Sequence, residues 1–186
     1  MIDRNKNVLL VRMDTIKSLI KSHKMIPHPE GGHYVEVYKN KDVSHIYYLL
    51  EKGQYSHWHR IKKNETIHFY TGSPLRIYTS KNGEEYEINE IGSKNRFIYS
   101  VRSNTWFSLE TTGLFSLIGC TVAPAFEFED LEIAPKKWKP SKFRGYLWKI
   151  KYLQVNSGIF KPCNLHTKLI KFSVKKFLIM TEKSLK

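Results

Sequence analysis

The chain has 186 residues and a formal charge of +14, but residues 136–186 hold 14 of the 31 Lys and Arg and only one of the 17 acidic residues, Glu182. No apolar run reaches the roughly 20 residues that span a bilayer, and the N-terminal residues lack the apolar stretch and cleavage site of a secretory signal. Two cysteines, Cys120 and Cys163, argue against a disulfide framework and against a zinc site, so we expect a cytoplasmic protein with one main domain.

The first predicted element is a short helix that starts at Asp14. Asp is a common N-cap residue, and the apolar residues Ile16, Leu19 and Ile20 follow at helical spacing. The helix should end before Pro27, because proline disfavours helical backbone in the residue before it. Residues 28–32 read His-Pro-Glu-Gly-Gly and predict a turn.

Short strands are predicted over most of the next hundred residues. Period-two patterns and runs of β-forming residues occupy segments 34–38, 44–50, 55–61, 66–70, 75–79, 86–91, 97–101, 105–109, 115–122 and 126–131. Many short strands at this spacing indicate an all-β sandwich or barrel. The pattern breaks down at Trp138, and residues 165–180 fit a basic amphipathic helix.

These shifts in pattern and charge define three segments. We expect an N-terminal extension over residues 1–12, a β-barrel domain over residues 13–135, and a basic C-terminal extension over residues 136–186 that is helical or disordered. The lysines and aromatic residues of the last segment suit nucleic acid or an anionic membrane surface. Alternatively, this segment is an extension without a selected role, which explains the same composition. The same alternative applies to residues 1–12.

The residues best suited to chemistry lie in two consecutive predicted strands. His57 and His59 are two residues apart in the first strand, so both should project from one face. Glu65 opens the second strand after the polar turn 62–64. Two imidazoles and a carboxylate brought together by a hairpin suit a divalent-metal triad or an acid–base cluster.

Alternation along the second strand separates two sets of side chains. Glu65, Ile67 and Phe69 should share one face, and His68 and Tyr70 the other. If Glu65 faces the barrel interior with His59, then His68 should pack elsewhere.

This segment resembles the first motif of the cupin superfamily. Gly53, Glu65 and Gly72 fit the frame of that motif. The histidine pair fits less well, because His57 and His59 lie too close to Gly53 and one residue too far from Glu65.

The second cupin motif should fall at residues 102–111, where Phe107 occupies the place of the third histidine ligand. We therefore expect no complete metal site, and a divalent metal held by His57, His59 and Glu65 is the alternative.

A closer resemblance is to the cupin family DUF985, also called cupin type 5, over roughly residues 14–134. It is carried by residues 27–32 (Pro-His-Pro-Glu-Gly-Gly), 46–50 (Ile-Tyr-Tyr-Leu-Leu), 58–60 (Trp-His-Arg), 65–70 (Glu-Thr-Ile-His-Phe-Tyr), 72–75 (Gly-Ser-Pro-Leu), 105–107 (Thr-Trp-Phe) and 119–124 (Gly-Cys-Thr-Val-Ala-Pro). The resemblance implies a jelly-roll barrel, usually a homodimer, with a pocket inside the barrel. The family is often labelled a predicted sugar epimerase. Here Arg102-Ser103-Asn104 replaces the usual Pro-Ala-Gly, and Ala125 replaces a glycine.

Motif and resemblance together give a set of candidate site residues. His59 is the candidate base, Glu65 its orienting partner or a second acid–base group, and Tyr70 a candidate acid. The candidate ligand contacts are His57, His68, Trp106, Glu30 and Phe107.

Three functions remain open at this point. The first is a cupin that binds a carbohydrate-like small molecule and acts as an isomerase or epimerase. The second is a metal-dependent cupin enzyme of the dioxygenase type. The third is a non-enzymatic dimeric barrel whose basic extension contacts nucleic acid or lipid.

Overall fold

The structure, a computed structural model, describes residues 15–94 and 96–145. The predictions for residues 1–12, for the helix over 165–180 and for most of the basic extension lie outside the described residues. Within the described part, no helix has the length and apolar character needed to cross a membrane.

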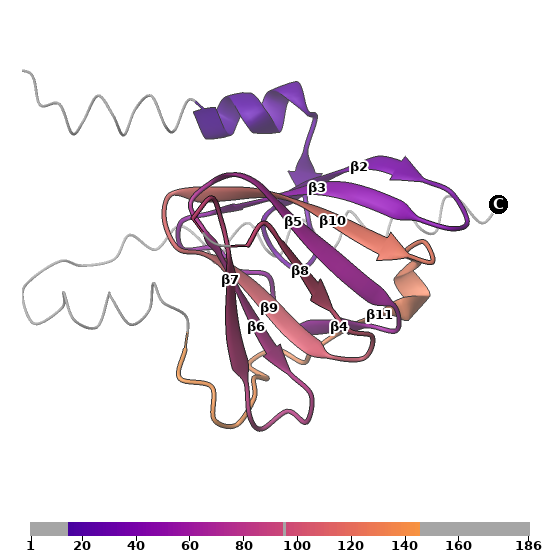
Figure 1. Cartoon of the computed structure of the whole chain (residues 1–186), viewed down its shortest axis with the longest axis vertical. Helices are drawn as coiled ribbons and strands as arrows, with labels where there is room; N and C mark the ends of the chain where they lie inside the picture. The colour runs from indigo at the N-terminus through magenta and orange to yellow at the C-terminus, as the bar shows by residue number, and fades with distance from the viewer. Residues whose placement is uncertain (1–14, 95, 146–186) are drawn as a thin grey trace, which may run out of the picture. The chain divides into compact units, whose positions relative to one another are not determined.

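The described strands form two antiparallel sheets, as predicted for an all-β barrel (Figure 1). In the six-stranded sheet the order is β1 (Ile26–Pro27), β2 (His33–Lys39), β3 (Ser44–Glu51), β10 (Phe115–Ala123), β5 (Asn64–Gly72) and β8 (Ile98–Val101). In the five-stranded sheet the order is β11 (Leu131–Ile133), β4 (His59–Ile61), β9 (Trp106–Thr111), β6 (Leu75–Ser80) and β7 (Glu87–Ile91). Neighbours such as β3 and β10 are far apart in the chain, so both sheets depend on long-range pairing.

A helix over residues 15–22 precedes the barrel, as the spacing of apolar residues predicts. Ile16 is buried in a cluster with Leu49 of β3 and Leu117 of β10, and Leu19 and Ile20 pack against the same cluster. The helix thereby covers part of the outer face of the six-stranded sheet.

Alternation along β5 determines which side chains enter the barrel. Glu65, Ile67 and Phe69 are buried, whereas His68 and Tyr70 are not. The main core between the sheets includes Ile67 and Phe69 together with apolar residues of β3, β6, β9 and β10. The predicted faces of this strand are confirmed.

Two predicted strands are shorter than expected or displaced. In the segment 55–61 the strand begins only at His59. The residues before it donate backbone hydrogen bonds to different parts of the chain: Ser56 N–H donates to Leu109 O at 3.0 Å, and His57 N–H donates to Glu30 O at 2.7 Å. The segment 126–131 forms the 3-10 turn η1 (Phe128–Asp130), and β11 begins only at Leu131.

Aromatic residues cover the outer face of the five-stranded sheet. Trp58, Tyr78 and Phe143 are buried together, and Trp138 and Trp106 pack against them. Other members of this outer aromatic cluster are Tyr55, Tyr86 and Ala134. Residues 138–143 therefore contribute side chains to the packing of the barrel.

Candidate active site

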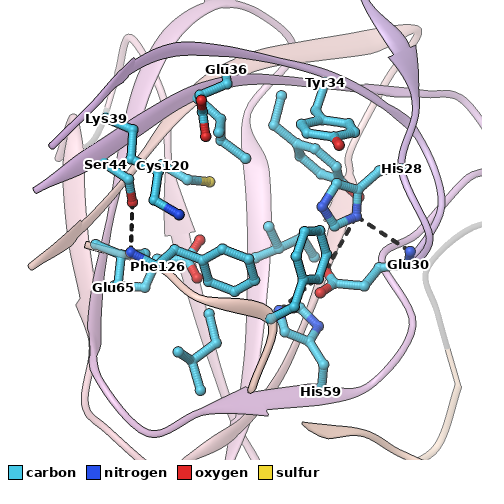
Figure 2. A pocket seen from close by; sticks show the side chains of 16 residues that line it. His28, Glu30, Tyr34, Glu36, Lys39, Ser44, His59, Glu65, Cys120 and Phe126 are labelled. Atoms are coloured by element: carbon cyan, nitrogen blue, oxygen red, sulfur yellow. Dashed lines mark hydrogen bonds and ion pairs between the residues drawn. The ribbon is translucent and has the colours of Figure 1, made fainter. Parts of the chain in front are cut away.

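A cavity of about 260 Å³ lies between the sheets (Figure 2). The lining has both apolar and polar parts. Its titratable side chains include His28, Glu30, Glu36, Lys39, His59 and Glu65, and its aromatic walls are Tyr34, Tyr48, Phe126 and Phe128. This volume is just below the roughly 300–1,000 Å³ of sites for drug-sized ligands, so the cavity suits a small molecule.

His59 is held rigidly at one wall of the cavity. Its side chain is 3% exposed, and its Nδ1 lies 2.7 Å from the backbone oxygen of His57. The ring of Phe107 packs behind it, with ring centroids 3.9 Å apart. Burial lowers the pKa of His59 to about 3, so the imidazole is neutral at neutral pH.

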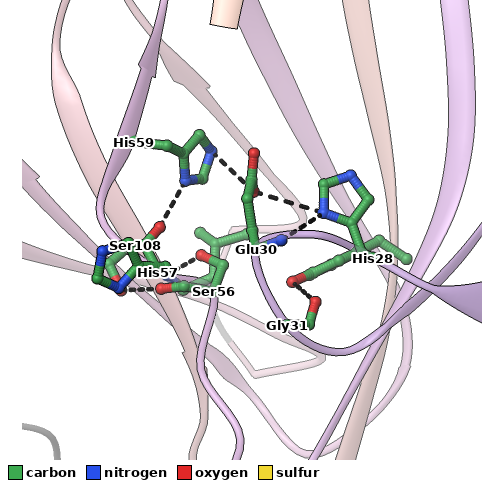
Figure 3. Close-up of polar contacts among 9 residues, drawn as sticks. His28, Glu30, Gly31, Ser56, His57, His59 and Ser108 are labelled. Carbon is green, nitrogen blue, oxygen red and sulfur yellow. Dashed lines mark hydrogen bonds and ion pairs between the residues drawn. The ribbon is translucent and has the colours of Figure 1, made fainter. Parts of the chain in front are cut away.

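The turn 28–32 brings Glu30 to His59 (Figure 3). Gly31 N–H donates to His28 O, and Gly31 and Gly32 have φ angles of +110° and +72°. A Cβ on Gly31 would lie 2.7 Å from Tyr55 O, so only glycine fits this approach. The result is a contact of 3.2 Å between Glu30 Oε2 and His59 Nε2.

The location of the proton in this pair follows from the hydrogen bonds. A backbone oxygen only accepts, so Nδ1 of His59 carries the ring hydrogen and Nε2 of the neutral ring has a lone pair. Burial, and then the charge of Glu65, raises the pKa of Glu30 well above its usual range. These effects favour the protonated form of Glu30, which would donate to the lone pair on Nε2 of His59.

His28 lies on the other side of Glu30. Its Nδ1 accepts a hydrogen bond from Glu30 N–H at 3.3 Å, so in the neutral ring Nε2 carries the hydrogen. The ring packs edge-on against Tyr34 and Tyr48, with centroid distances of 4.6 and 5.4 Å. Burial lowers the pKa of His28 to about 4.

Glu65 and Cys120 form a second polar part of the lining, apart from the histidines (Figure 2). Glu65 is 6% exposed and Cys120 is 5% exposed. Burial raises the pKa of Glu65 to about 7, and a hydrogen bond from the Cys120 thiol partly offsets this. Burial also raises the pKa of Cys120, which argues against a thiolate nucleophile.

Residues 124–130, which we call the strap, place Phe126 and Phe128 against the cavity. The two rings meet edge-on with centroids 5.3 Å apart. Phe126 N–H donates to Ser44 Oγ at 2.9 Å, and Glu127 pairs with Lys39 Nζ at 3.0 Å. The strap is thus tied to both ends of the β2–β3 hairpin loop.

The structure brings three of the candidate residues, Glu30, His59 and Glu65, into the cavity lining. The carboxyl group that contacts His59 is that of Glu30, rather than that of Glu65 as the hairpin suggested. Phe107 lies behind His59 in the core.

His57 and Trp106 do not line the cavity. His57 Nε2 lies 2.9 Å from Ala134 O. Because residues 55–58 do not form a strand, the two-residue spacing does not place His57 beside His59. Trp106 packs against Trp138, and the guanidinium of Arg60 lies 4.6 Å from its ring centroid.

His68 and Tyr70 also lie outside the cavity, on the face of β5 opposite to Glu65. His68 Nε2 is 3.1 Å from the hydroxyl of Thr121. Tyr70 is 51% exposed and packs edge-on against Tyr47.

Sequence reasoning missed His28, Tyr48 and Cys120 as lining residues. The turn 28–32 was a visible signal for His28, because its two glycines mark a close backbone approach. The backbone that this turn approaches, at Tyr55, is distant in sequence. A local pattern therefore could not show that His28 and His59 lie on either side of the Glu30 carboxyl group.

The metal triad that the sequence offered as an alternative is not brought together in the described residues. His57 Nε2 faces Ala134 O, and the two nitrogens of His59 face His57 O and Glu30. Over residues 15–94 and 96–145, no three His, Cys, Asp or Glu side chains are arranged to hold a metal ion. His57, His59 and Glu65 therefore do not fit the site that the first cupin motif implies.

Comparison with known proteins identifies relatives of this fold. The family described as Cupin superfamily (DUF985) matches residues 17–134. An X-ray structure of a Shewanella oneidensis protein is 30% identical, with a TM-score of 0.61 over 64% of this chain and 84% of that chain. A search of the curated proteins gave no match.

Two more distant structures share the fold. A hypothetical protein from Leishmania major is 24% identical, with a TM-score of 0.58 over 66% of this chain and 88% of that chain. A mutant of Bacillus subtilis oxalate decarboxylase is 12% identical, with a TM-score of 0.51 over 62% of this chain and 31% of that chain.

Proposed function

The chain belongs to the DUF985 family of the cupin superfamily, and on this premise we propose that its cavity binds a small carbohydrate-like carbonyl compound and isomerises or epimerises it by proton transfer. The observation that carries this proposal is the buried contact of 3.2 Å between Glu30 Oε2 and His59 Nε2. A carboxyl and an imidazole that share one proton inside a cavity form a general acid–base unit.

The chemistry requires removal of a proton from the carbon beside a carbonyl group. The free oxygen of Glu30, Oε1, accepts that proton while Oε2–H passes its own proton to Nε2 of His59. The resulting imidazolium keeps its Nδ1–H bond to His57 O, which holds the ring in place. Return of the proton from Glu30 Oε1 to the neighbouring carbon gives an isomer. Return of the same proton to the original carbon, after the planar intermediate has turned its other face to Glu30, gives an epimer.

His28 supports the negative charge that develops on the carbonyl oxygen. Because Nδ1 accepts from Glu30 N–H, Nε2–H is the donor available to a bound molecule. A neutral imidazole with a pKa lowered to about 4 donates this hydrogen bond without giving up its proton at neutral pH.

Exchange of substrate hydrogen for deuterium tests the proposal without knowledge of the product. The protein is incubated in D₂O with a panel of aldoses and ketoses, and loss of the proton beside the carbonyl is followed by ¹H NMR. We expect at least one compound to exchange, and we expect Glu30→Gln and His59→Asn each to slow that exchange by about 10²-fold or more.

Glu36→Gln is the matched control. Glu36 also borders the cavity, but it is exposed to solvent, and in the proposed mechanism it transfers no proton. It should exchange at the rate of the wild type. Exchange that is equally fast in Glu30→Gln, or no exchange with any member of the panel, would contradict the proposal.

A further inference from the structure

Glu65 is a buried carboxyl group that lacks a cationic partner. Its side chain projects from β5 into the cavity, and the residue is 6% exposed. Within residues 15–94 and 96–145, the ion pairs of Lys, Arg and His involve other acids. The Cys120 thiol is a weak donor, whereas a carboxylate has about four lone-pair sites to fill.

The charges around the cavity disfavour a negatively charged ligand. Its acidic residues Glu30, Glu36 and Glu65 offer no positive charge in either protonation state, and its lysine, Lys39, already pairs with Glu127. The two lining histidines are neutral at neutral pH, as shown above. An anion would lose its hydration on entry and would meet no free cation in the described lining.

The apolar part of the lining suits a positive charge. Tyr48 is buried, and Tyr34, Phe126 and Phe128 also border the cavity. Aromatic rings attract ammonium groups through their π-electrons, most strongly where water is excluded. A carboxylate combined with several aromatic rings is the chemistry that recognises an organic cation.

We infer that the cavity is specific for a small amine: a compound whose ammonium group binds against Glu65 while its carbonyl end lies at the Glu30–His59 pair. The assignment of the carbonyl end rests on the proposed function, whereas the assignment of the ammonium group rests on Glu65 and the aromatic walls. The substrate class is thus an amino sugar or a similar amino-carbonyl compound, rather than a nucleotide sugar or a carboxylic acid.

Three hexoses of similar size and different charge test this inference: D-glucosamine, D-glucose and D-glucuronate. Each is titrated calorimetrically into the full-length protein at pH 6. We expect D-glucosamine to bind about tenfold or more tightly than D-glucose, and D-glucuronate to bind most weakly.

The same titration should show release of a proton. Burial raises the pKa of Glu65 to about 7, so the free protein holds a proton there at pH 6 that a bound ammonium would displace. The other titratable groups near this position are Cys120, Glu30 and Tyr48. Heats measured in two buffers of different ionisation enthalpy report this proton.

Glu65→Gln should remove both the preference for D-glucosamine and the proton release. Glu87→Gln, at an exposed residue of β7 outside the cavity lining, should keep both. Circular dichroism checks that each variant is folded. Equal binding of the three sugars, no saturable binding of D-glucosamine, or a preference that persists in Glu65→Gln would overturn the inference.

The Glu30→Gln variant separates the two proposals. If it still prefers D-glucosamine but has lost hydrogen exchange, both stand. If exchange is unaffected while the preference is present, the proposed acid–base role fails and the amine specificity stands.

Discussion

Burial of the Glu65 carboxyl group in the cavity makes the stability of the folded protein depend on pH. In the unfolded chain it ionises near its ordinary pKa of 4.5, whereas in the folded protein burial raises the pKa to about 7. From pH 4.5 to 7 the unfolded state loses the proton first, so this residue makes the folded protein progressively less stable as pH rises.

Replacing Glu65 with Gln removes this dependence. The free energy of unfolding of the wild type minus that of Glu65→Gln should therefore fall by roughly 3 kcal/mol between pH 4 and pH 8. His28 and His59 act in the opposite direction over pH 3–6.5, but they are present in both proteins and largely cancel in the difference. Urea unfolding of both proteins at several pH values measures this difference in the free energy of unfolding. A difference that does not change with pH would contradict the prediction.

Gly31 is the residue on which the position of Glu30 depends most directly. Gly31→Ala brings a Cβ within 2.7 Å of Tyr55 O at a φ of +110°. It should destabilise the protein by about 1–3 kcal/mol and reduce hydrogen exchange, because the turn that carries Glu30 must shift. Gly53→Ala is the control: its φ is +85°, but nothing lies within 4 Å of the added Cβ. Equal effects of the two substitutions in thermal unfolding and in exchange would show that the close approach is unimportant.

At the scale of single elements, β5 shows how much a strand pattern can predict. Its alternation predicted that Glu65 faces inward and His68 outward, because side chains of a regular strand alternate whatever its partners are. The same reasoning was wrong for His57, since the backbone before β4 bonds to the 28–32 turn and to β9 one residue at a time. Irregular backbone of this kind depends on distant residues, which a local pattern does not contain.

Two neighbouring residues of β5 give a test of this alternation. Ile67 is fully buried in the core, whereas Thr66 is partly exposed on the other face. Ile67→Ala should lower the free energy of unfolding by about 2–5 kcal/mol, and Thr66→Ala by about 0.5 kcal/mol or less. Denaturant unfolding of both variants is the measurement, and similar losses would show that β5 has the wrong face inward.

At the scale of the whole molecule, the folded unit extends beyond the expected boundary at residue 135. Phe143 is 4% exposed, and its ring lies edge-on to Trp58 and Tyr78, with centroids 5.3 and 5.2 Å away. We propose that residues 136–145 belong to the barrel domain. The boundary could not be predicted from charge, because the lysines of this segment point to solvent or to acids while its aromatic residues pack inward.

Truncation tests this boundary. A chain ending at residue 135 loses Trp138 and Phe143 and should be less stable than a chain ending at residue 145 by about 3 kcal/mol or more, since loss of one buried Phe alone has an effect of this size. Thermal unfolding of the two chains makes the comparison. Equal midpoints would place the boundary back at 135.

The outer aromatic cluster also determines what intrinsic tryptophan fluorescence can detect in this protein. Trp58, Trp106 and Trp138, the tryptophans of the described residues, all belong to it, and none of them lines the cavity. Emission from these three tryptophans should therefore shift when residues 138–143 detach from the five-stranded sheet and change little when a small molecule enters between the sheets. Ligand screening by intrinsic fluorescence would then overlook compounds that bind, so calorimetry or NMR is the better assay.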